Sequence, residues 1–246
     1  MRALILAAGE GSRLRPFTER VAKPMLEVGG LPILEYNVRL AAKHGITDLV
    51  INVHYRPEAI VDHFGDGSNF GVAIRYSREP VLLGTAGALN PFRAFFAEAT
   101  FAVLYGDNLT TCDLSAVIAR HRATQAVATI ALFHREDPTA SGIVALDDAG
   151  FVTRFLEKPK PEEVFSNWVN AGVLVLEPVV FDAVPLEGPS DFGRDVLPEL
   201  LARGQRIAGY KMAEELCWID SPADYERTLS LWTERRAQHA PRRTEG

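Results

Sequence analysis

The feature that most constrains the fold is an alternation of short apolar runs and longer amphipathic segments through the first 108 residues. The short runs are rich in β-branched residues, as buried strands are, whereas the longer segments repeat apolar residues at helical spacing. This alternation is typical of βαβ units on a mostly parallel sheet flanked by helices, so we predict an α/β fold. The expected strands are residues 2–8, 48–55, 71–77 and 101–108, and the expected helices are residues 32–45, 57–64 and 87–96. Gly45 stands where a left-handed C-terminal cap would end the first helix, and Pro57 stands in the first turn of the second.

After residue 108 the pattern changes. Residues 142–159 read as two strands around an Asp-Ala-Gly turn, which predicts a β-hairpin inserted into the domain. Helix signals return later in the chain, where Ser190 stands at an expected N-cap position. The later expected strands are residues 168–178, 205–212 and 216–220, and the later expected helices are residues 191–204 and 222–236.

Neither a linker nor an internal repeat divides the chain, so we predict one domain over residues 1–234. Residues 235–246 hold several Arg residues and almost no bulky apolar side chains. That composition cannot bury enough apolar surface to order a segment, so we expect a disordered tail there.

Composition excludes several classes of protein. The net charge of −6 comes from interspersed acidic and basic residues, without the dense Lys/Arg block that nucleic-acid binding requires. The two cysteines, Cys112 and Cys217, suggest neither a disulfide framework nor a zinc site, which fits a reducing cytoplasm. The apolar N-terminal run stops at Gly9, too early to span a membrane. We expect no nucleic-acid or membrane partner, and a homo-oligomer is compatible with the sequence.

A glycine-rich loop follows the first expected strand. Backbone N–H groups in the segment from Gly9 to Ser12 could converge on a phosphate. The loop is not a P-loop, because no Gly-Lys-Ser/Thr follows, and Leu14 replaces the third glycine of the dinucleotide fingerprint. From the glycines alone, an ordinary strand-to-loop turn is an equally good interpretation.

The longer stretch LAAGEGSRLRPFTERVAKPMLEVGGLPILEY, residues 6–36, resembles the N-terminal signature of the sugar nucleotidylyltransferase family. The resemblance implies a single-domain Rossmann-like fold of the nucleotide-diphospho-sugar transferase type. It also implies that Arg13 lies over the β- and γ-phosphates of a nucleotide and that Lys23 lies near the reacting phosphates. By the same resemblance, the residues that hold the nucleotide in this stretch are Leu6, Ala8, Gly9, Gly11, Ser12 and Arg13.

Nucleotidyl transfer crowds anionic oxygens together, and positioned cations offset the charge that develops. Arg13 suits a forked contact to phosphate oxygens, whereas Lys23 suits a point charge. The alternative for either residue is a solvated surface side chain, and this is the interpretation we keep for Arg15 and Arg20.

Two aspartates, Asp107 and Asp220, stand at the C-terminal ends of expected strands. Asp107 stands at the carboxyl end of a parallel strand, where open α/β sheets bind ligands, although an Asx turn or helix cap is the alternative. Resemblance to the family's Gly-Asp-Asn segment implies a Mg²⁺ ligand at Asp107, next to Gly106 in the sugar-phosphate site. Asp220 is the second expected metal ligand. The family pattern after it is shortened here, so Asp220 could contact the metal through water, and Asp224 fits a helix start better.

Further motifs resemble the parts of the family that bind base and sugar. Gly84 and Thr85 match the segment whose backbone faces the base, although small residues can also serve helix packing. In Glu157-Lys158-Pro159, the family's glutamate meets sugar hydroxyls and its lysine meets the sugar phosphate, with a surface ion pair as the alternative. The residues expected at the sugar phosphate are Gly106, Glu157, Lys158, Asn170 and Gly172.

The sequence therefore predicts a Mg²⁺-dependent enzyme that joins a nucleoside triphosphate to a sugar 1-phosphate. Arg13, Lys23 and Asp107 are the expected catalytic residues, and no side-chain nucleophile is needed because the phosphate monoester attacks directly. GTP with a mannose- or heptose-type phosphate is the first choice, and UTP or dTTP with a glucose-type phosphate is the second. A catalytically silent sugar-nucleotide regulator, or a transferase for a non-sugar phosphate, stays open.

Overall fold

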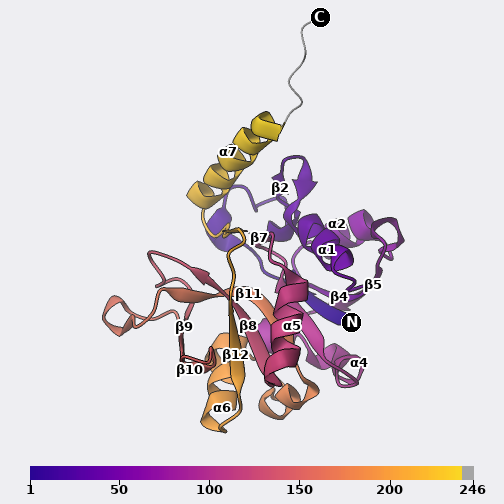
Figure 1. Ribbon diagram of the computed structural model, residues 1–246. Coiled ribbons are helices and arrows are strands. Elements are labelled where there is room, and N and C mark those ends of the chain that lie inside the picture. The colour runs from indigo at the N-terminus through magenta and orange to yellow at the C-terminus, as the bar shows by residue number, and fades with distance from the viewer. Residues whose placement is uncertain (240–246) are drawn as a thin grey trace, which may run out of the picture.

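The first apolar runs of the chain form the parallel part of a nine-stranded sheet (Figure 1). The structure is a computed structural model that describes the chain path of residues 1–239 and the side chains of residues 1–231. Strand β1 lies between β4 and β6, and β5 follows β4 at the edge. All three pairings are parallel, as the alternating pattern predicts. The strands are β1 Arg2–Leu6, β4 Asp48–Val53, β5 Ala73–Arg78 and β6 Phe101–Tyr105.

On the other side of β6 the sheet becomes mixed. Strand β11 pairs antiparallel with β6 and with β8, and β12 pairs parallel with β8. The expected hairpin insertion is confirmed as the antiparallel pair β9 and β10. These strands are β8 Ala128–His134, β9 Gly142–Leu146, β10 Val152–Glu157, β11 Trp168–Leu176 and β12 Ile207–Lys211.

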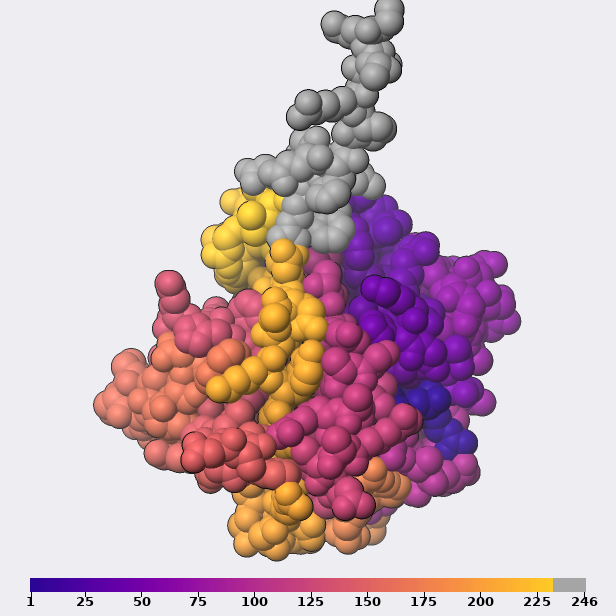
Figure 2. Space-filling model, viewed as in Figure 1, coloured from indigo at the N-terminus to yellow at the C-terminus, as the bar shows by residue number. Residues whose placement is uncertain are grey.

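Two short pairs lie outside the main sheet. Strands β2 and β3 form one, and β13 pairs with β7, which joins the C-terminal part of the chain to its middle. Figure 2 shows the orange-to-yellow C-terminal part running along the surface beside magenta residues from that middle section. The strand expected at 216–220 is thus only two residues long. The short strands are β2 Glu27–Val28, β3 Leu31–Pro32, β7 Leu109–Thr110 and β13 Leu216–Cys217.

Two of the three residues expected at helix ends, Gly45 and Pro57, are confirmed there. Gly45 has a φ of 72° after α1, and Pro57 is the first residue of α2. The helix expected at 87–96 is broken instead, because Pro91 lacks the N–H that a continuous helix would use. The expected Ser190 cap is also wrong, since the cap is Asp191. The helices are α1 Ile33–Lys43, α2 Pro57–Phe64, α3 Gly84–Gly87, α4 Arg93–Phe96, α5 Leu114–Thr124, α6 Leu197–Ala202 and α7 Pro222–His239.

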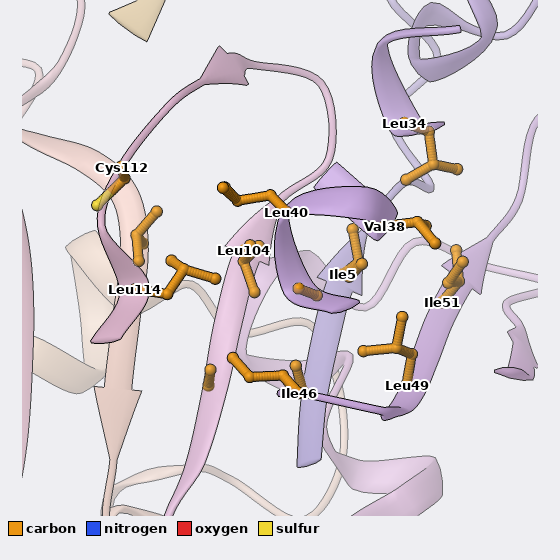
Figure 3. Close-up of a cluster of buried hydrophobic side chains, with 14 of the residues drawn as sticks. Ile5, Leu34, Val38, Leu40, Ile46, Leu49, Ile51, Leu104, Cys112 and Leu114 are labelled. Carbon is orange, nitrogen blue, oxygen red and sulfur yellow. The ribbon is translucent and has the colours of Figure 1, made fainter. Parts of the chain in front are cut away.

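Alternate residues of the central strands face two separate hydrophobic clusters. Ala3 and Ile5 point to the cluster under α1, α2 and α5, whereas Leu4 points to the cluster under α4 and α6. Figure 3 shows part of the first cluster, in which Ile5 and Ile51 lie beside Val38 of α1. A side-chain period of two therefore gives the sheet two buried faces, and both faces are covered by helices.

A third cluster joins the C-terminal part of the chain to the loops after β1. Leu14 and Ile219 are buried in it, together with Tyr225 of α7. The Tyr225 hydroxyl donates to the Glu27 carbonyl oxygen at 2.7 Å, and its ring meets Phe17 edge-on. In Figure 1, α7 accordingly lies beside β2. The contact brings the segment after β13 to the edge of the sheet where β1 and β6 end.

The domain boundary expected at residue 234 falls inside α7, which continues to His239. Of the tail expected over 235–246, residues 240–246 lie outside the described residues, so the tail stays a prediction. Within the part of the chain that the structure describes, no helix combines the length and the apolar composition that crossing a membrane requires.

Candidate active site

The glycine loop after β1 is shaped by its second glycine. Gly11 has a φ of 64°, and a Cβ there would lie 2.8 Å from the Lys23 Cβ. The Thr18 hydroxyl donates to the Gly11 carbonyl oxygen at 2.7 Å and holds this turn against the following segment. Gly9, by contrast, has open space around it. Gly11 is therefore required by the backbone, whereas Gly9 leaves room at the end of β1.

Lys23 lies between the two aspartates that the sequence predicted as metal ligands. Its Nζ donates to Asp107 Oδ2 at 2.6 Å and to Asp220 Oδ1 at 2.9 Å. Only 5% of Lys23 is exposed, so its charge is partnered rather than solvated. Arg13 is largely exposed, and its guanidinium reaches Asp220 at 3.4 Å. Residues 13, 23, 107 and 220, which are far apart in sequence, thus form one charged cluster.

The charges of this cluster stabilise one another. Burial alone lowers the pKa of Lys23, but the Asp107 and Asp220 carboxylates outweigh it and raise that pKa above its usual value. For Asp220, burial raises the pKa, and the nearby Lys23 ammonium more than offsets this, so the pKa is lowered. Lys23 is therefore a cation and Asp220 an anion at neutral pH.

A magnesium ion fits the chemistry of this cluster. The Asp107 and Asp220 carboxylates already converge on one cation, the Lys23 ammonium, which shows that their oxygens can face a common positive charge. Among the described residues, no group of three or more His, Cys, Asp or Glu side chains could hold a metal. Mg²⁺ commonly takes one or two carboxylates and completes its shell with substrate phosphates and water. The two aspartates meet that requirement.

Two cavities open on either side of the cluster. The first, of about 300 Å³, lies over the end of β1 and contains Lys23 and Asp107. It brings together Leu6, Ala8, Gly9, Gly84 and Thr85, as the sequence predicted for a nucleotide site. Gly11 and Ser12 do not line either cavity, and Arg13 lines the second one instead. The residues lining the first cavity are Leu6, Ala7, Ala8, Gly9, Lys23, Pro24, Asn52, Glu79, Leu82, Gly84, Thr85, Tyr105, Asp107 and Asp191.

The second cavity, of about 190 Å³, lies between the hairpin and the N-terminal part of β11, where Asn170 lines it. It brings together the polar residues expected at a sugar phosphate, with Asp107 and Asp220 at one side. The residues lining it are Arg13, Thr85, Tyr105, Asp107, Asn108, Ala140, Ser141, Gly142, Glu157, Lys158, Asn170, Asp191, Trp218 and Asp220.

Two of the glycines expected in this site lie behind its lining. Gly106 packs against β1, where its N–H donates to the Leu6 carbonyl oxygen at 2.9 Å and a Cβ would lie 2.8 Å from Ile5. Gly172 has a φ of 76° and lies against the Tyr105 side chain. Both glycines are needed for close packing, and they position the neighbouring Asp107 and Tyr105 rather than face the cavity themselves.

Glu157 and Lys158 are held in unusual states at the end of β10. Burial, and then the negative charge of Asp191, raise the pKa of Glu157 above its usual value. Lys158 has a φ of 50°, a strained backbone conformation for a residue with a Cβ, and its N–H donates to the Ser141 carbonyl oxygen at 3.1 Å. Strain of this kind often occurs at ligand sites, because the surrounding structure must hold a side chain in one direction.

Several lining residues were missed in the sequence. The sequence pattern places Asp191 inside a helix, whereas Asp191 caps the π-helical turn Phe192–Val196 and lines both cavities. Glu79 is 4% exposed at the end of β5 and lines the first cavity. Trp218 could have been found, because it lies two residues before Asp220 and side chains at that spacing share a face of an extended segment. No local pattern marks Asp191 or Glu79 as a lining residue, because the cavities form only when distant segments pack together.

The fold and the site define an α/β protein with two adjacent cavities at the carboxyl ends of its strands, separated by a Lys–Asp–Asp cluster suited to phosphate and metal. Residues 2–223 match the Nucleotidyl transferase family, and the chain belongs to that family. The family and the fold predicted from the sequence are thereby confirmed.

Two curated relatives and one solved structure are similar over most of the chain. A UTP–glucose-1-phosphate uridylyltransferase of Synechocystis is 36% identical over 233 residues, which cover 89% of this chain and 60% of the relative. A mannose-1-phosphate guanylyltransferase of Mycobacterium tuberculosis is 36% identical over 226 residues, covering 92% and 62%. The chain thus spans about three fifths of the length of these relatives. A Bacillus anthracis structure named as a glucose-1-phosphate thymidylyltransferase has a TM-score of 0.85 at 25% identity, covering 94% of this chain and 95% of that one.

Proposed function

We propose that this protein transfers a nucleotidyl group from a nucleoside triphosphate to a sugar 1-phosphate, giving a nucleoside diphosphate sugar and pyrophosphate. The observation that carries the proposal is the position of the charged cluster. Asp107 lines both cavities, Lys23 lines the first and Asp220 lines the second. The Lys23 ammonium contacts both aspartates. Two ligands bound in the two cavities would therefore meet at the cluster.

The reaction needs no side-chain nucleophile. An oxygen of the sugar phosphate forms a bond to the α-phosphorus, the bond between that phosphorus and the bridging oxygen to the β-phosphate breaks, and the electron pair leaves on pyrophosphate. Lys23 and Arg13 supply positive charge where charge accumulates in the transition state. We propose Mg²⁺ as the cofactor, held by Asp107 and Asp220, where it would polarise the phosphate oxygens and offset their charge.

The second cavity suits a sugar phosphate. Glu157 offers carboxylate oxygens to sugar hydroxyls, and Asn170 offers an amide, whose Oδ1 also accepts the Gly172 N–H at 2.9 Å. Lys158 and Arg13 place positive charge in the same cavity. Trp218 adds an aromatic surface, which commonly packs against the apolar side of a ring. Because Glu157 and Asn170 can both accept hydrogen bonds from hydroxyl groups, the cavity favours a sugar over a small alkyl phosphate such as phosphocholine.

For the base we propose guanine first, on the chemistry of Glu79. Its Oε1 accepts from Asn52 Nδ2 at 2.9 Å and its Oε2 accepts the Leu83 N–H at 3.0 Å, which fixes a buried carboxylate in the first cavity. A carboxylate only accepts hydrogen bonds, and the guanine edge presents two adjacent N–H donors, whereas uracil and thymine present one donor between two carbonyl oxygens. The Mycobacterium tuberculosis relative is likewise named for guanylyl transfer.

The first-choice substrates are therefore GTP and a mannose- or heptose-type 1-phosphate. UTP or dTTP with a glucose-type 1-phosphate is the second choice, and the Synechocystis relative carries a uridylyltransferase name. A cytoplasmic location fits the two free cysteines Cys112 and Cys217 and completes the proposal.

One experiment separates these possibilities. Pyrophosphate release is measured with Mg²⁺ for each of five common nucleoside triphosphates against a panel of mannose, heptose and glucose 1-phosphates. We expect the highest kcat/KM with GTP and a mannose- or heptose-type phosphate. Preference for UTP or dTTP would contradict the role of Glu79 in selecting guanine. Binding of nucleotide without turnover of any pair would contradict the enzyme and support a silent sugar-nucleotide regulator.

A further inference from the structure

Side chains tie α3, which carries Gly84 of the first cavity, to the segment around Asp191, which lies against Glu157 of the second cavity. Thr85 Oγ1 donates to Asp191 Oδ2 at 2.8 Å and accepts the Phe192 N–H at 2.9 Å. Asp191 Oδ1 in turn accepts the N–H groups of Gly193 at 2.9 Å and Arg194 at 3.2 Å. The Thr85 hydroxyl thus uses its donor and an acceptor between the two segments. We name the Thr85–Asp191 pair the clasp.

The backbones of the two segments are paired as well. The Ser190 carbonyl oxygen accepts the N–H groups of Ala86 at 2.9 Å and Gly87 at 3.1 Å, and the Ser190 N–H donates to the Leu83 carbonyl oxygen at 2.8 Å. A Cβ on Gly84 would overlap the same Ser190 carbonyl. The two segments are therefore in direct contact, and a displacement of α3 would be transmitted to residues 190–193.

The segment that contains Asp191 also contacts Glu157, the carboxylate proposed to bind the sugar hydroxyls. Gly193 lies directly against Glu157, so that a Cβ on Gly193 would overlap Glu157 Oε2. The charge of Asp191 is close enough to contribute to the raised pKa of Glu157. In the part of the chain that the structure describes, Thr85 and Asp191 are two of only four residues that line both cavities, with Tyr105 and Asp107. The clasp is therefore part of the wall that the two cavities share.

We propose that Thr85 and Asp191 are positioning residues that couple the two substrate sites, so that a nucleotide seated on α3 raises the affinity of the second cavity for the sugar phosphate. The proposal rests on the proposed function. A bound base would hold α3 in place, the clasp would hold residues 190–193, and Gly193 would hold the Glu157 carboxylate toward the sugar hydroxyls. Coupling between two binding equilibria is reciprocal, so the sugar phosphate must raise nucleotide affinity by the same factor.

Calorimetric titration tests the coupling directly. Mannose 1-phosphate is titrated into the full chain with Mg²⁺, in the absence and in the presence of saturating α,β-methylene GTP, which cannot react. For the wild type we expect the Kd to fall at least about fivefold when the nucleotide is present. Thr85→Val keeps the shape of the side chain but removes its hydrogen bonds, so we expect this ratio to fall to about one. Thr85→Ser keeps a hydroxyl and should restore it.

Thr124→Val is the matched control. The Thr124 hydroxyl bonds only within α5, to the carbonyl oxygens of Arg120 at 2.9 Å and His121 at 3.1 Å, so the ratio should stay at the wild-type value. A double variant, Thr85→Val with Glu157→Gln, gives a second readout. If the clasp acts through Glu157, the two changes should weaken mannose 1-phosphate binding less than the product of their separate effects.

Two results would overturn the proposal, and they are distinguishable. A wild-type ratio that persists in Thr85→Val, or fully multiplicative effects in the double variant, would show that the clasp does not couple the sites although both ligands bind. The wild type could instead bind neither α,β-methylene GTP nor mannose 1-phosphate, nor any other nucleotide and sugar phosphate of the substrate panel. That result would overturn the proposed function together with the coupling.

Discussion

Lys23 and Asp107 form the shortest charge pair of the site, with 2.6 Å between Nζ and Oδ2. The lysine enters from the 3₁₀ turn Lys23–Met25, and the aspartate follows β6, so the pair joins the glycine-loop side of the domain to the centre of the sheet. Because the same ammonium also contacts Asp220, two carboxylates are held together by one buried cation. Removal of any of the three charges leaves the others unbalanced.

The first prediction concerns the cation. Lys23→Met should lower kcat about 100-fold or more, because a positioned charge at the reacting phosphates is lost. It should also leave Asp107 and Asp220 without their common partner. We therefore expect MgCl₂ to raise the Tm of this variant more than that of the wild type, with NaCl at equal ionic strength as the control. An equal Tm response in both proteins would contradict a metal position between the two carboxylates.

The second prediction concerns Asp107, the proposed metal ligand, which lines both cavities. Asp107→Asn should lower pyrophosphate release at least about 100-fold at saturating substrates, since the amide is a poor Mg²⁺ ligand. The far-UV circular dichroism should stay unchanged. Asp62→Asn, at an exposed position of α2, is the matched control and should keep wild-type turnover. Near-normal activity of Asp107→Asn would show that Asp107 does not hold the metal.

The third prediction concerns the pH dependence of sugar binding. Burial and the charge of Asp191 raise the pKa of Glu157, so this carboxylate becomes protonated at a higher pH than an ordinary glutamate. A protonated carboxyl accepts sugar hydroxyls poorly, and we expect the KM for the sugar phosphate to rise as the pH falls toward that raised pKa. In Glu157→Gln this acid limb should be missing, while the titration of the substrate phosphate stays. Identical KM profiles for both proteins would contradict the role of Glu157.

The fourth prediction concerns stability away from the site. Glu35 of α1 is buried, and it accepts from Arg39 Nε at 2.7 Å and bonds His63 Nε2 at 2.7 Å. Burial raises the pKa of Glu35, but the bonds to His63 and Arg39 outweigh it, so the pKa is lowered. A lowered folded-state pKa contributes stability above the unfolded-state pKa, and this stability is lost as pH falls through the folded value.

Glu35→Gln should accordingly reduce the free energy of unfolding by about 2 kcal/mol at pH 7, measured by urea denaturation, since it weakens two charge-assisted bonds. The difference from wild type should shrink below the usual Glu pKa of about 4.3. Glu58→Gln, at an exposed ion pair with Arg78, is the control and should change little. A difference that does not depend on pH would show that the charge of Glu35 contributes nothing.

Local sequence signals predicted most strands and helices of this protein, but not helix α5 and strand β8, which lie between β7 and the hairpin. The apolar runs around Ile5, Ile51 and Val103 are buried on both sides, so few other structures could bury them, and the sheet follows from that requirement. Gly45 and Pro57 act within one turn of chain and gave correct helix ends. Asp107 was also expected at the site, because it follows a parallel strand and such strands end at the same edge of a sheet. Glu157, which ends an antiparallel hairpin strand, was expected only from its resemblance to the family motif.

Only the tertiary structure decided how distant segments meet. The sequence could not show that Asp191 turns toward Thr85, because their contact spans about a hundred residues and the local pattern around Asp191 reads as a plain helix. It likewise could not place Gly106 and Gly172 behind the cavity, since a glycine is compatible both with a ligand and with a packed neighbour. Local propensity acts over a few residues, whereas a binding site is made by long-range packing, and the charged cluster around Lys23 exists only in the folded chain.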